Sequence, residues 1–225
     1  MRRLIAFAAV LVSSGLSASV SNATTFNFGC ITNNSAANCA IGAAQLAVDV
    51  TAGPLANQVL FTFTNTGASA SSITDVYFDD GTLLGISAIR DVDDAIVPLG
   101  LGHPGVDFTS GSASPPNLPG GNAVGFVVTS GFLADSDPAV QPNGVNPSEY
   151  LQIAFNLMPT KTFADTLNAL AQGAGTGGLR IGIHVQAIGT GGSESFVNIV
   201  PEPGTFALLA LGLAGLTARG RRRSD

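Results

Sequence analysis

The chain has 225 residues, of which only 11% are charged, and its formal net charge is −6. The charge is unevenly distributed: the span from Thr24 to Val200 holds three of the nine basic residues but thirteen of the fifteen acids, a net charge of about −10. A surface this acidic repels phosphate backbones, so nucleic-acid binding is excluded as a function.

The first 23 residues have the features of a secretory signal peptide. Two arginines precede the apolar run Leu4–Val12, and Ser21–Ala23 fits the pattern of small residues before a cleavage site. A buried N-terminal helix is the alternative, but the apolar run has no polar face. We expect cleavage after Ala23, with Ala18 and Ser19 as alternative positions.

The two cysteines of the chain, Cys30 and Cys39, follow this segment closely. In an exported protein such a pair predicts a disulfide that closes a small surface loop. A zinc site would want histidine partners, and a redox motif usually has two residues between its cysteines, so both are weaker alternatives.

Residues 24–199 are expected to form one domain of short β-strands separated by turns rich in Gly, Pro and Asn. Apolar residues alternate with polar or small ones in segments such as Leu46, Val48 and Val50, which is the period of a half-buried strand. Asp79-Asp80-Gly81 has the composition of a tight hairpin turn between two of these strands. The sequence predicts roughly nine strands, among them residues 45–50, 59–64, 73–78, 83–89, 124–129, 150–157, 179–188 and 195–200.

One segment has helical spacing instead. Thr162 is placed to cap a helix in which Phe163, Leu167 and Leu170 share one face, and Gly173 follows the last turn. With long loops at residues 110–122 and 135–147, the pattern predicts an all-β protein, an antiparallel β-sandwich of jelly-roll-like kind with one short helix.

Acidic residues cluster near several predicted strand ends. Oxygen-rich loops bind calcium, but none of these clusters matches the twelve-residue calcium loop. A solvated acidic face is therefore favoured and no cofactor is expected. Calcium stays as the alternative, with the candidate ligands Asp79, Asp80, Asp91, Asp93 and Asp94.

No constellation of residues indicates catalysis. His103 lies in a turn-like Gly-His-Pro-Gly segment, and His184 is expected to point outward from a strand between Ile183 and Val185. No Gly-x-Ser-x-Gly elbow occurs, and thirteen acids single out no catalytic pair. We predict that the protein is not an enzyme.

A carbohydrate-binding module is the main alternative function. β-Sandwiches of this size often bind glycans through exposed aromatic side chains and loop carboxylates, yet the chain has no tryptophan and only Tyr77 and Tyr150 as tyrosines. Its thirteen phenylalanines mostly fit apolar strand patterns and are expected in the core.

Residues 200–225 differ in composition from everything before them. Thr205–Ala218 is an apolar stretch of fourteen residues, about 21 Å long as a helix, against the roughly 20 residues of a full membrane span. An amphipathic or core helix is the alternative, but the stretch has no polar face. We expect a short transmembrane helix, stopped on its cytoplasmic side by Arg219, Arg221, Arg222 and Arg223.

The Val200-Pro201-Glu202-Pro203 segment, the apolar stretch and the arginine cluster together resemble the PEP-CTERM protein-sorting domain of Gram-negative bacteria. The body segments FTFTNTG, SSITDVYFDDG and LRIGIHVQ resemble parts of uncharacterised proteins that carry this domain. The resemblance implies export through the inner membrane and transient recognition by an exosortase, an integral-membrane cysteine protease or transpeptidase. It implies that Pro201, Glu202 and Pro203 are substrate residues rather than catalytic ones.

Bearers of this domain are typically associated with exopolysaccharide and biofilm production. The resemblance therefore implies a protein of the cell envelope, the outer surface or the extracellular matrix, with exopolysaccharide as a further partner.

Overall fold

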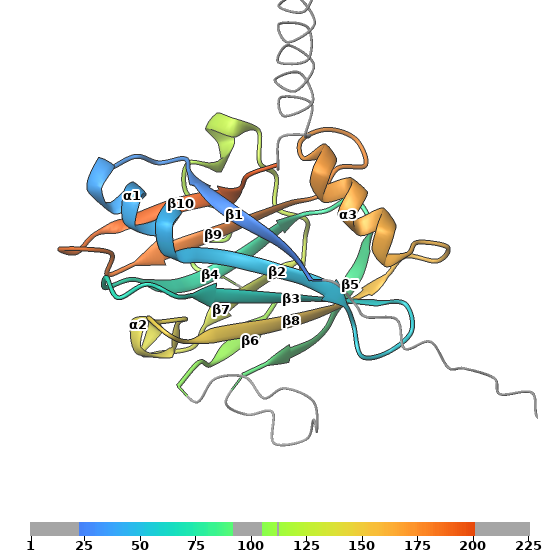
Figure 1. The fold of residues 1–225 in the computed structure, drawn as a ribbon, viewed down its shortest axis with the longest axis horizontal. Coiled ribbons are helices and arrows are strands. Elements are labelled where there is room, and N and C mark those ends of the chain that lie inside the picture. Colours follow the sequence, from blue (N-terminus) through green and yellow to red (C-terminus); the bar gives the residue numbers. More distant parts are fainter. Residues whose placement is uncertain (1–22, 92–104, 112, 201–225) are drawn as a thin grey trace, which may run out of the picture.

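The computed structural model describes residues 23–91, 105–111 and 113–200, which form a body whose regular structure consists mostly of antiparallel strands (Figure 1). The signal-peptide segment, Asp93, Asp94, His103 and the expected transmembrane helix lie outside the described residues. The strands are β1 Thr24–Cys30, β2 Leu46–Ala52, β3 Gln58–Asn65, β4 Ser72–Asp79, β5 Leu83–Arg90, β6 Phe108–Ser110, β7 Leu133–Ser136, β8 Tyr150–Leu157, β9 Arg180–Gln186 and β10 Ser193–Asn198. The helices are α1 Ala36–Gln45, α2 Val140–Asn143 and α3 Phe163–Gln172, with a 3-10 turn η1 at Gly121–Val124.

The strands form one sheet in the order β5-β8-β3-β2-β1-β10-β9-β4-β7-β6. β1 joins two halves of this sheet, because residues 24–27 pair with β2 and residues 28–30 pair with β10. We call β5, β8, β3 and β2 the first half, and β10, β9, β4, β7 and β6 the second half. The halves fold over each other and the two edge strands, β5 and β6, come into contact, so the sheet is nearly closed into a barrel. The expectation of an antiparallel all-β fold is confirmed.

Aromatic side chains fill the space between the two halves. Phe61 and Phe155 of the first half contact Phe78 of the second, with ring centroids 5.2 and 4.6 Å from Phe78. Both contacts are edge-to-face, the geometry that aromatic pairs prefer. β2, β3 and β8 alternate buried and more exposed residues over most of their length, so the alternation in the sequence identifies the strands of this half well.

The predicted hairpin through Asp79-Asp80-Gly81 is wrong. β4 pairs with β9 and β7, whereas β5 pairs with β8 in the opposite half of the sheet. Asp80 Oδ1 accepts hydrogen bonds from the backbone N–H of Thr82 (2.8 Å) and Leu83 (2.7 Å), which turns the chain from one half to the other. Gly81 is needed for close packing, since a Cβ there would lie 2.4 Å from the carbonyl oxygen of Gly178.

The predicted strand at residues 124–129 is also wrong. The chain forms η1 and then an irregular segment that lies on the outer face of the second half of the sheet. There Leu118 and Phe126 pack with Tyr77 and Leu133 in a second, smaller apolar cluster. Val127 and Val128 fit a strand pattern, but this segment covers a sheet instead of joining it.

The predicted helix is present as α3 and begins as expected. Thr162 accepts a hydrogen bond from the Asp165 N–H while the Asp165 carboxylate accepts one from the Thr162 N–H, a complete capping box. The sequence did not predict α1, whose first turn lies in the segment expected to be a small disulfide-closed loop and which continues beyond Cys39. Ser35 caps α1, and Gly42 lets the helix lie against the core residue Phe196.

Candidate functional site

A row of four polar side chains crosses the outer face of the second half of the sheet. Asp135 of β7 lies opposite Asp75 of β4, Asp75 lies opposite His184 of β9, and His184 lies opposite Ser195 of β10. Directly opposed residues in antiparallel strands place their side chains on the same face. The sheet therefore brings together residues up to 120 positions apart in the sequence, which no local pattern predicts.

Asp75 is the most perturbed acid of this row. Its side chain is only 1% exposed, and its Oδ2 atom accepts a hydrogen bond from Thr74 Oγ1 at 2.8 Å. Burial raises the pKa of Asp75 to about 7, against the lowering effect of the Thr74 hydrogen bond, and the charge of Asp135 adds to the rise. Burial likewise raises the pKa of Asp135. The arrangement suits a carboxyl pair that holds one proton between its members.

His184 occupies the next position of the row. It lies on the face turned away from the core, as expected, but it is buried rather than solvated, with 8% of its surface exposed. Its Nδ1 atom is 3.2 Å from Ser195 Oγ, and desolvation lowers the pKa of the imidazole. Ser195, His184 and Asp75 thus lie next to one another on three neighbouring strands, but Ser195 is fully buried. A nucleophile in this position would not meet a substrate carbonyl.

An open hollow of about 600 Å³ lies beside His184. On its surface Gln141 Nε2 donates to Gln186 Oε1 at 3.2 Å, so amide groups with further donors and acceptors face the solvent. The lining is largely polar and comes from α2, from the facing ends of β9 and β10 and from the turn between them: Gln141, His184, Gln186, Ala187, Gly191, Gly192 and Ser193.

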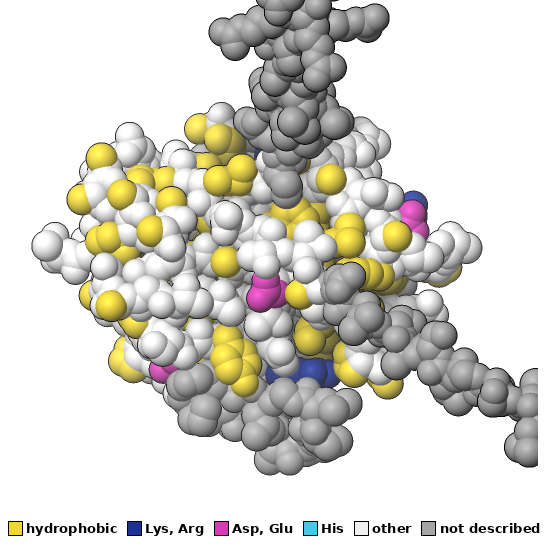
Figure 2. All heavy atoms as spheres, in the orientation of Figure 1, with side chains coloured by type: hydrophobic (Ala, Val, Ile, Leu, Met, Phe, Trp, Pro, Cys, Tyr) yellow, Lys and Arg dark blue, Asp and Glu magenta, His cyan; other side chains and the backbone are white. Residues whose placement is uncertain are grey.

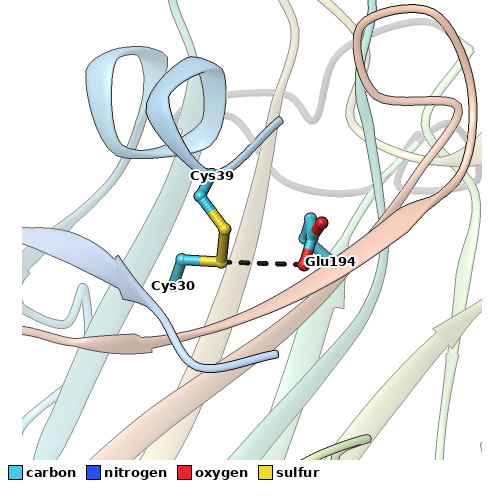
Figure 3. Close-up of side chains that lie close together, drawn as sticks. All are labelled: Cys30, Cys39 and Glu194. Atoms are coloured by element: carbon cyan, nitrogen blue, oxygen red, sulfur yellow. Dashed lines mark hydrogen bonds between the residues drawn. A yellow bond between two sulfur atoms is a disulfide. The ribbon is translucent and has the colours of Figure 1, made fainter. Parts of the chain in front are cut away.

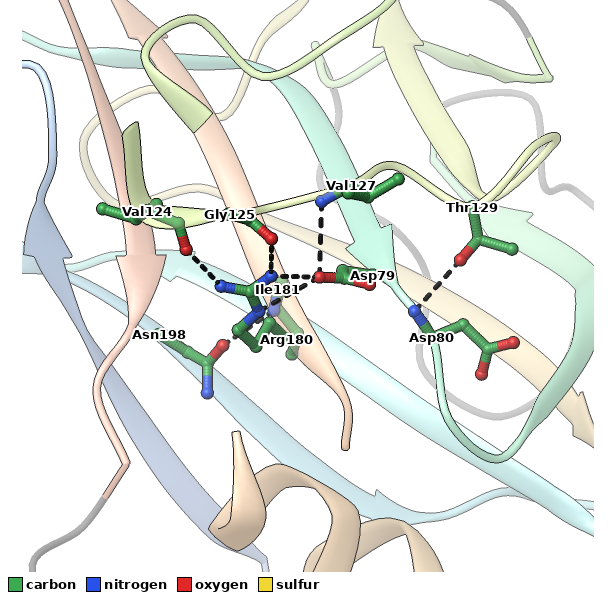
Figure 4. Close-up of polar contacts among 9 residues, drawn as sticks. All are labelled: Asp79, Asp80, Val124, Gly125, Val127, Thr129, Arg180, Ile181 and Asn198. Atoms are coloured by element: carbon green, nitrogen blue, oxygen red, sulfur yellow. Dashed lines mark hydrogen bonds and ion pairs between the residues drawn. The ribbon is translucent and has the colours of Figure 1, made fainter. Parts of the chain in front are cut away.

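The described calcium candidates have structural roles. Asp79 forms an ion pair with Arg180, with its Oδ2 atom 3.1 Å from the Arg180 Nε (Figure 4). Asp80 holds the turn after β4, and Asp91 Oδ2 accepts the Phe108 N–H at 2.9 Å. Among the described residues, these acids do not belong to a group of three side chains that could share one ion.

Cys30 and Cys39 form the predicted disulfide, with an S–S distance of 2.05 Å (Figure 3). Glu194 lies beside it, with Oε2 3.7 Å from Cys30 Sγ. These three are the only described residues grouped closely enough to suggest a metal site, but both sulfur atoms are bonded to each other.

The sequence did not point to Glu194, which is fully buried in the second half of the sheet. Its carboxylate accepts hydrogen bonds from Thr32 Oγ1 (2.5 Å), the Asn34 N–H (3.0 Å) and the Ser35 N–H (2.6 Å). It thereby fixes the segment that leads into α1. Glutamate in a strand otherwise rich in Ser and Asn gives no sequence signal for such a role.

The described chain ends at a firmly held position. Asn198 Oδ1 accepts the Ile181 N–H at 2.7 Å, and the Ile199 N–H donates to the Asn27 carbonyl oxygen at 2.8 Å. Val200 then packs against the end of α3, since a Cβ at Gly173 would lie 2.7 Å from Val200 Cγ2. The chain leaves the body between η1 and α3 (Figure 1). We call this position the exit.

The family model that describes the PEP-CTERM protein-sorting motif matches residues 200–223. The chain carries a PEP-CTERM motif. The match begins at the exit and confirms the resemblance drawn from the Pro-Glu-Pro segment, the apolar stretch and the arginines. The motif residues Pro201, Glu202 and Pro203, and the arginines predicted to stop the membrane helix, Arg219, Arg221, Arg222 and Arg223, lie outside the described part of the structure.

The PEP-CTERM motif indicates that the protein is exported and sorted to the cell envelope or outer surface. No curated protein and no solved structure matches the chain. In the part of the chain that the structure describes, no helix has the length and apolarity needed to span a membrane.

Proposed function

We propose that this protein is a non-catalytic component of the surface or extracellular matrix of a Gram-negative bacterium, delivered there by an exosortase and associated with exopolysaccharide or biofilm. The observation that carries the proposal is the PEP-CTERM match at residues 200–223. In this proposal the signal peptide directs export, the apolar stretch Thr205–Ala218 holds the chain in the inner membrane, and the arginines that follow stay cytoplasmic.

The position of Val200, the last described residue of the body, supports this proposal. Val200 is held against α3, and the next three residues are the Pro201-Glu202-Pro203 segment. Proline fixes its own backbone and disfavours helix in the residue before it, so the segment favours extended conformations. Extended backbone is the form that a protease can accommodate.

The test compares the protein in wild-type cells with the protein in cells that lack the exosortase. We expect extracellular mature protein without residues 219–223 in the wild type, and membrane-bound protein with an intact tail in the mutant. Mass spectrometry of the C-terminal peptides and cell fractionation provide the readout. Glu202→Gln should reproduce the mutant phenotype, whereas Ser224→Ala, outside the matched residues, should be processed normally. Extracellular mature protein with an intact Arg221–Arg223 segment would contradict the proposal.

The hollow beside His184 favours a second function, binding of carbohydrate from the matrix. Its amide and hydroxyl groups suit the hydroxyl groups of a sugar, although its lining has no phenylalanine, tyrosine or tryptophan. Gln141→Ala and Gln186→Ala should weaken retention of the protein on purified exopolysaccharide, while Gln152→Ala on the other half of the sheet should not. If the unaltered protein is not retained on any polysaccharide, this second function is ruled out.

A further inference from the structure

Three exposed apolar side chains lie around the exit. Val124 is 42% exposed, Val127 is 69% exposed and Ile199 is 51% exposed. We call them the exit patch. Figure 2 shows hydrophobic side chains scattered among polar and backbone atoms over one face of the body, with few charged side chains between them. Single exposed valines are ordinary, but three around a chain exit are a local feature of the surface.

Arg180 connects the members of this patch. Its Nη1 atom donates to the Val124 carbonyl oxygen at 2.9 Å, and its partner Asp79 accepts the Val127 N–H at 3.4 Å (Figure 4). On its other side, the neighbouring Ile181 N–H is bonded to Asn198, directly before Ile199. The backbone at or next to each member of the patch is therefore tied to the same end of the sheet.

The length of chain beyond the patch limits how far the body can be from a membrane. Five residues, 200–204, separate Ile199 from the apolar stretch that begins at Thr205. Even fully extended, the chain from Ile199 to Thr205 reaches at most about 20 Å. The headgroup layer itself takes up roughly 5 to 8 Å of this distance. A body tethered this closely has its exit end turned toward the lipid.

Charge favours the same orientation. The body carries a net charge of about −10, so most of its surface is repelled by anionic headgroups. At the exit end, the Asp79 carboxylate is paired with Arg180. Exposed valine and isoleucine side chains gain free energy when they enter the lipid interface.

We propose that, before exosortase processing, the exit patch rests on the outer face of the lipid bilayer and so holds the Pro201-Glu202-Pro203 segment at headgroup level. The occupant of the patch is thus a lipid surface. This inference rests on the proposed function in one respect, namely that residues 205–218 enter the membrane. It adds that the body, and not the tail alone, contacts lipid, and that the exosortase meets its substrate in one orientation.

The chain has no tryptophan, so one introduced tryptophan reports its own surroundings. Val127→Trp places this probe in the patch. Thr190→Trp, in the exposed turn between β9 and β10 at the opposite end of these strands, is the matched control. Each full-length variant is reconstituted without exosortase into phosphatidylcholine vesicles, with or without bromine atoms on the acyl chains. Flotation with the vesicles confirms that the tail is inserted.

We expect brominated lipid to remove about half of the emission of the Val127→Trp variant, and that emission to lie at shorter wavelength than the emission of the Thr190→Trp variant. Equal quenching of the two probes would overturn the proposal. A blue-shifted but unquenched probe at position 127 would mean that protein, such as a second copy of the chain, covers the patch, which also overturns it. If the chain does not float with the vesicles, the membrane tail is refuted, and both proposals with it. If the position-127 probe is quenched on vesicles but the protein is not processed in cells that make the exosortase, only the exosortase proposal is refuted.

Discussion

The buried carboxyl pair makes the stability of the body depend on pH, and Asp75→Asn is the substitution that tests this. The pKa of Asp75 is raised from 3.8 to about 7 in the folded protein. The unfolded chain therefore loses this proton at lower pH than the folded chain does. As the pH rises from about 4 to 7, the unfolded state binds fewer protons than the folded state, and stability falls.

The size of the effect follows from the two pKa values. One pKa unit corresponds to about 1.4 kcal/mol, so the shift of Asp75 lowers the free energy of unfolding by roughly 2 to 3 kcal/mol between pH 5 and pH 8. For a chain of this size that is a fall of roughly 5 to 10 °C in the thermal midpoint. His184 acts in the opposite sense, because its lowered pKa costs stability as the pH falls below about 6.5.

Asparagine keeps the shape of the Asp75 side chain but does not titrate. Between pH 5 and pH 8 the thermal midpoint of the wild type should therefore fall by roughly 5 to 10 °C more than that of Asp75→Asn. The variant gains stability relative to the wild type as the pH rises. The His184 contribution cancels because both proteins contain it. Thr62→Val, on the other half of the sheet, removes no titrating group, so it is the control and should follow the wild-type profile. Parallel profiles for the wild type and Asp75→Asn would refute the assignment of a shared proton to Asp75 and Asp135.

Four further substitutions, one of them a control, test the structural roles described above, each by thermal or urea unfolding. Thr162→Ala removes the α3 cap and should cost about 1 kcal/mol, so an unchanged midpoint would show that the capping box is not formed. Gly42→Ala forces a Cβ to within 2.2 Å of the Phe196 ring and should destabilise the body by roughly 1 to 3 kcal/mol. Gly85→Ala, where a Cβ meets no atom within 4 Å, should be nearly neutral, and equal effects at both sites would contradict the packing of α1. Glu194→Gln replaces an acceptor by a donor facing N–H groups and should cost about 2 kcal/mol, while a neutral result would mean that this carboxylate does not anchor the segment before α1.

Sequence patterns identified the strands that have one buried and one partly exposed face. β3 is one of these, with Phe61 and Phe63 in the core and Thr62 between them. β9 behaves differently, because all of its residues except Gln186 are buried. Its outer face is covered in part by Leu118 and Phe126. A Cβ at Gly182 would lie 2.6 Å from Leu118 Cδ2 and 3.1 Å from Phe126 Cζ. The sequence predicted that His184 points away from the core but not that it is buried, because its neighbours across the sheet, such as Asp75, are distant in the sequence.

The hairpin error has a different physical origin. Asp80-Gly81 has the same local turn chemistry whether the chain turns back on its own sheet or crosses to the opposite half. Which of these occurs depends on the pairing of β5 with β8, a choice made by residues some 70 positions away. The polar row and the Glu194 anchor depend on long-range pairing in the same way. The sorting segment needs no such pairing, since its three parts are consecutive in the chain, and it was identified from the sequence alone.

The position of β1 has a consequence for when the body can fold during export. β1 is the first strand of the part of the chain that the structure describes, yet it joins the two halves, and its second partner is β10, the last strand of that part. A chain that crosses a membrane from its N-terminus exposes β1 early but cannot supply β10 until residues 193–198 have followed. Completion of the barrel therefore waits for nearly the whole body to cross, and β10 arrives immediately before the PEP-CTERM segment. The step that completes the fold and the step that presents the sorting signal thus coincide in time.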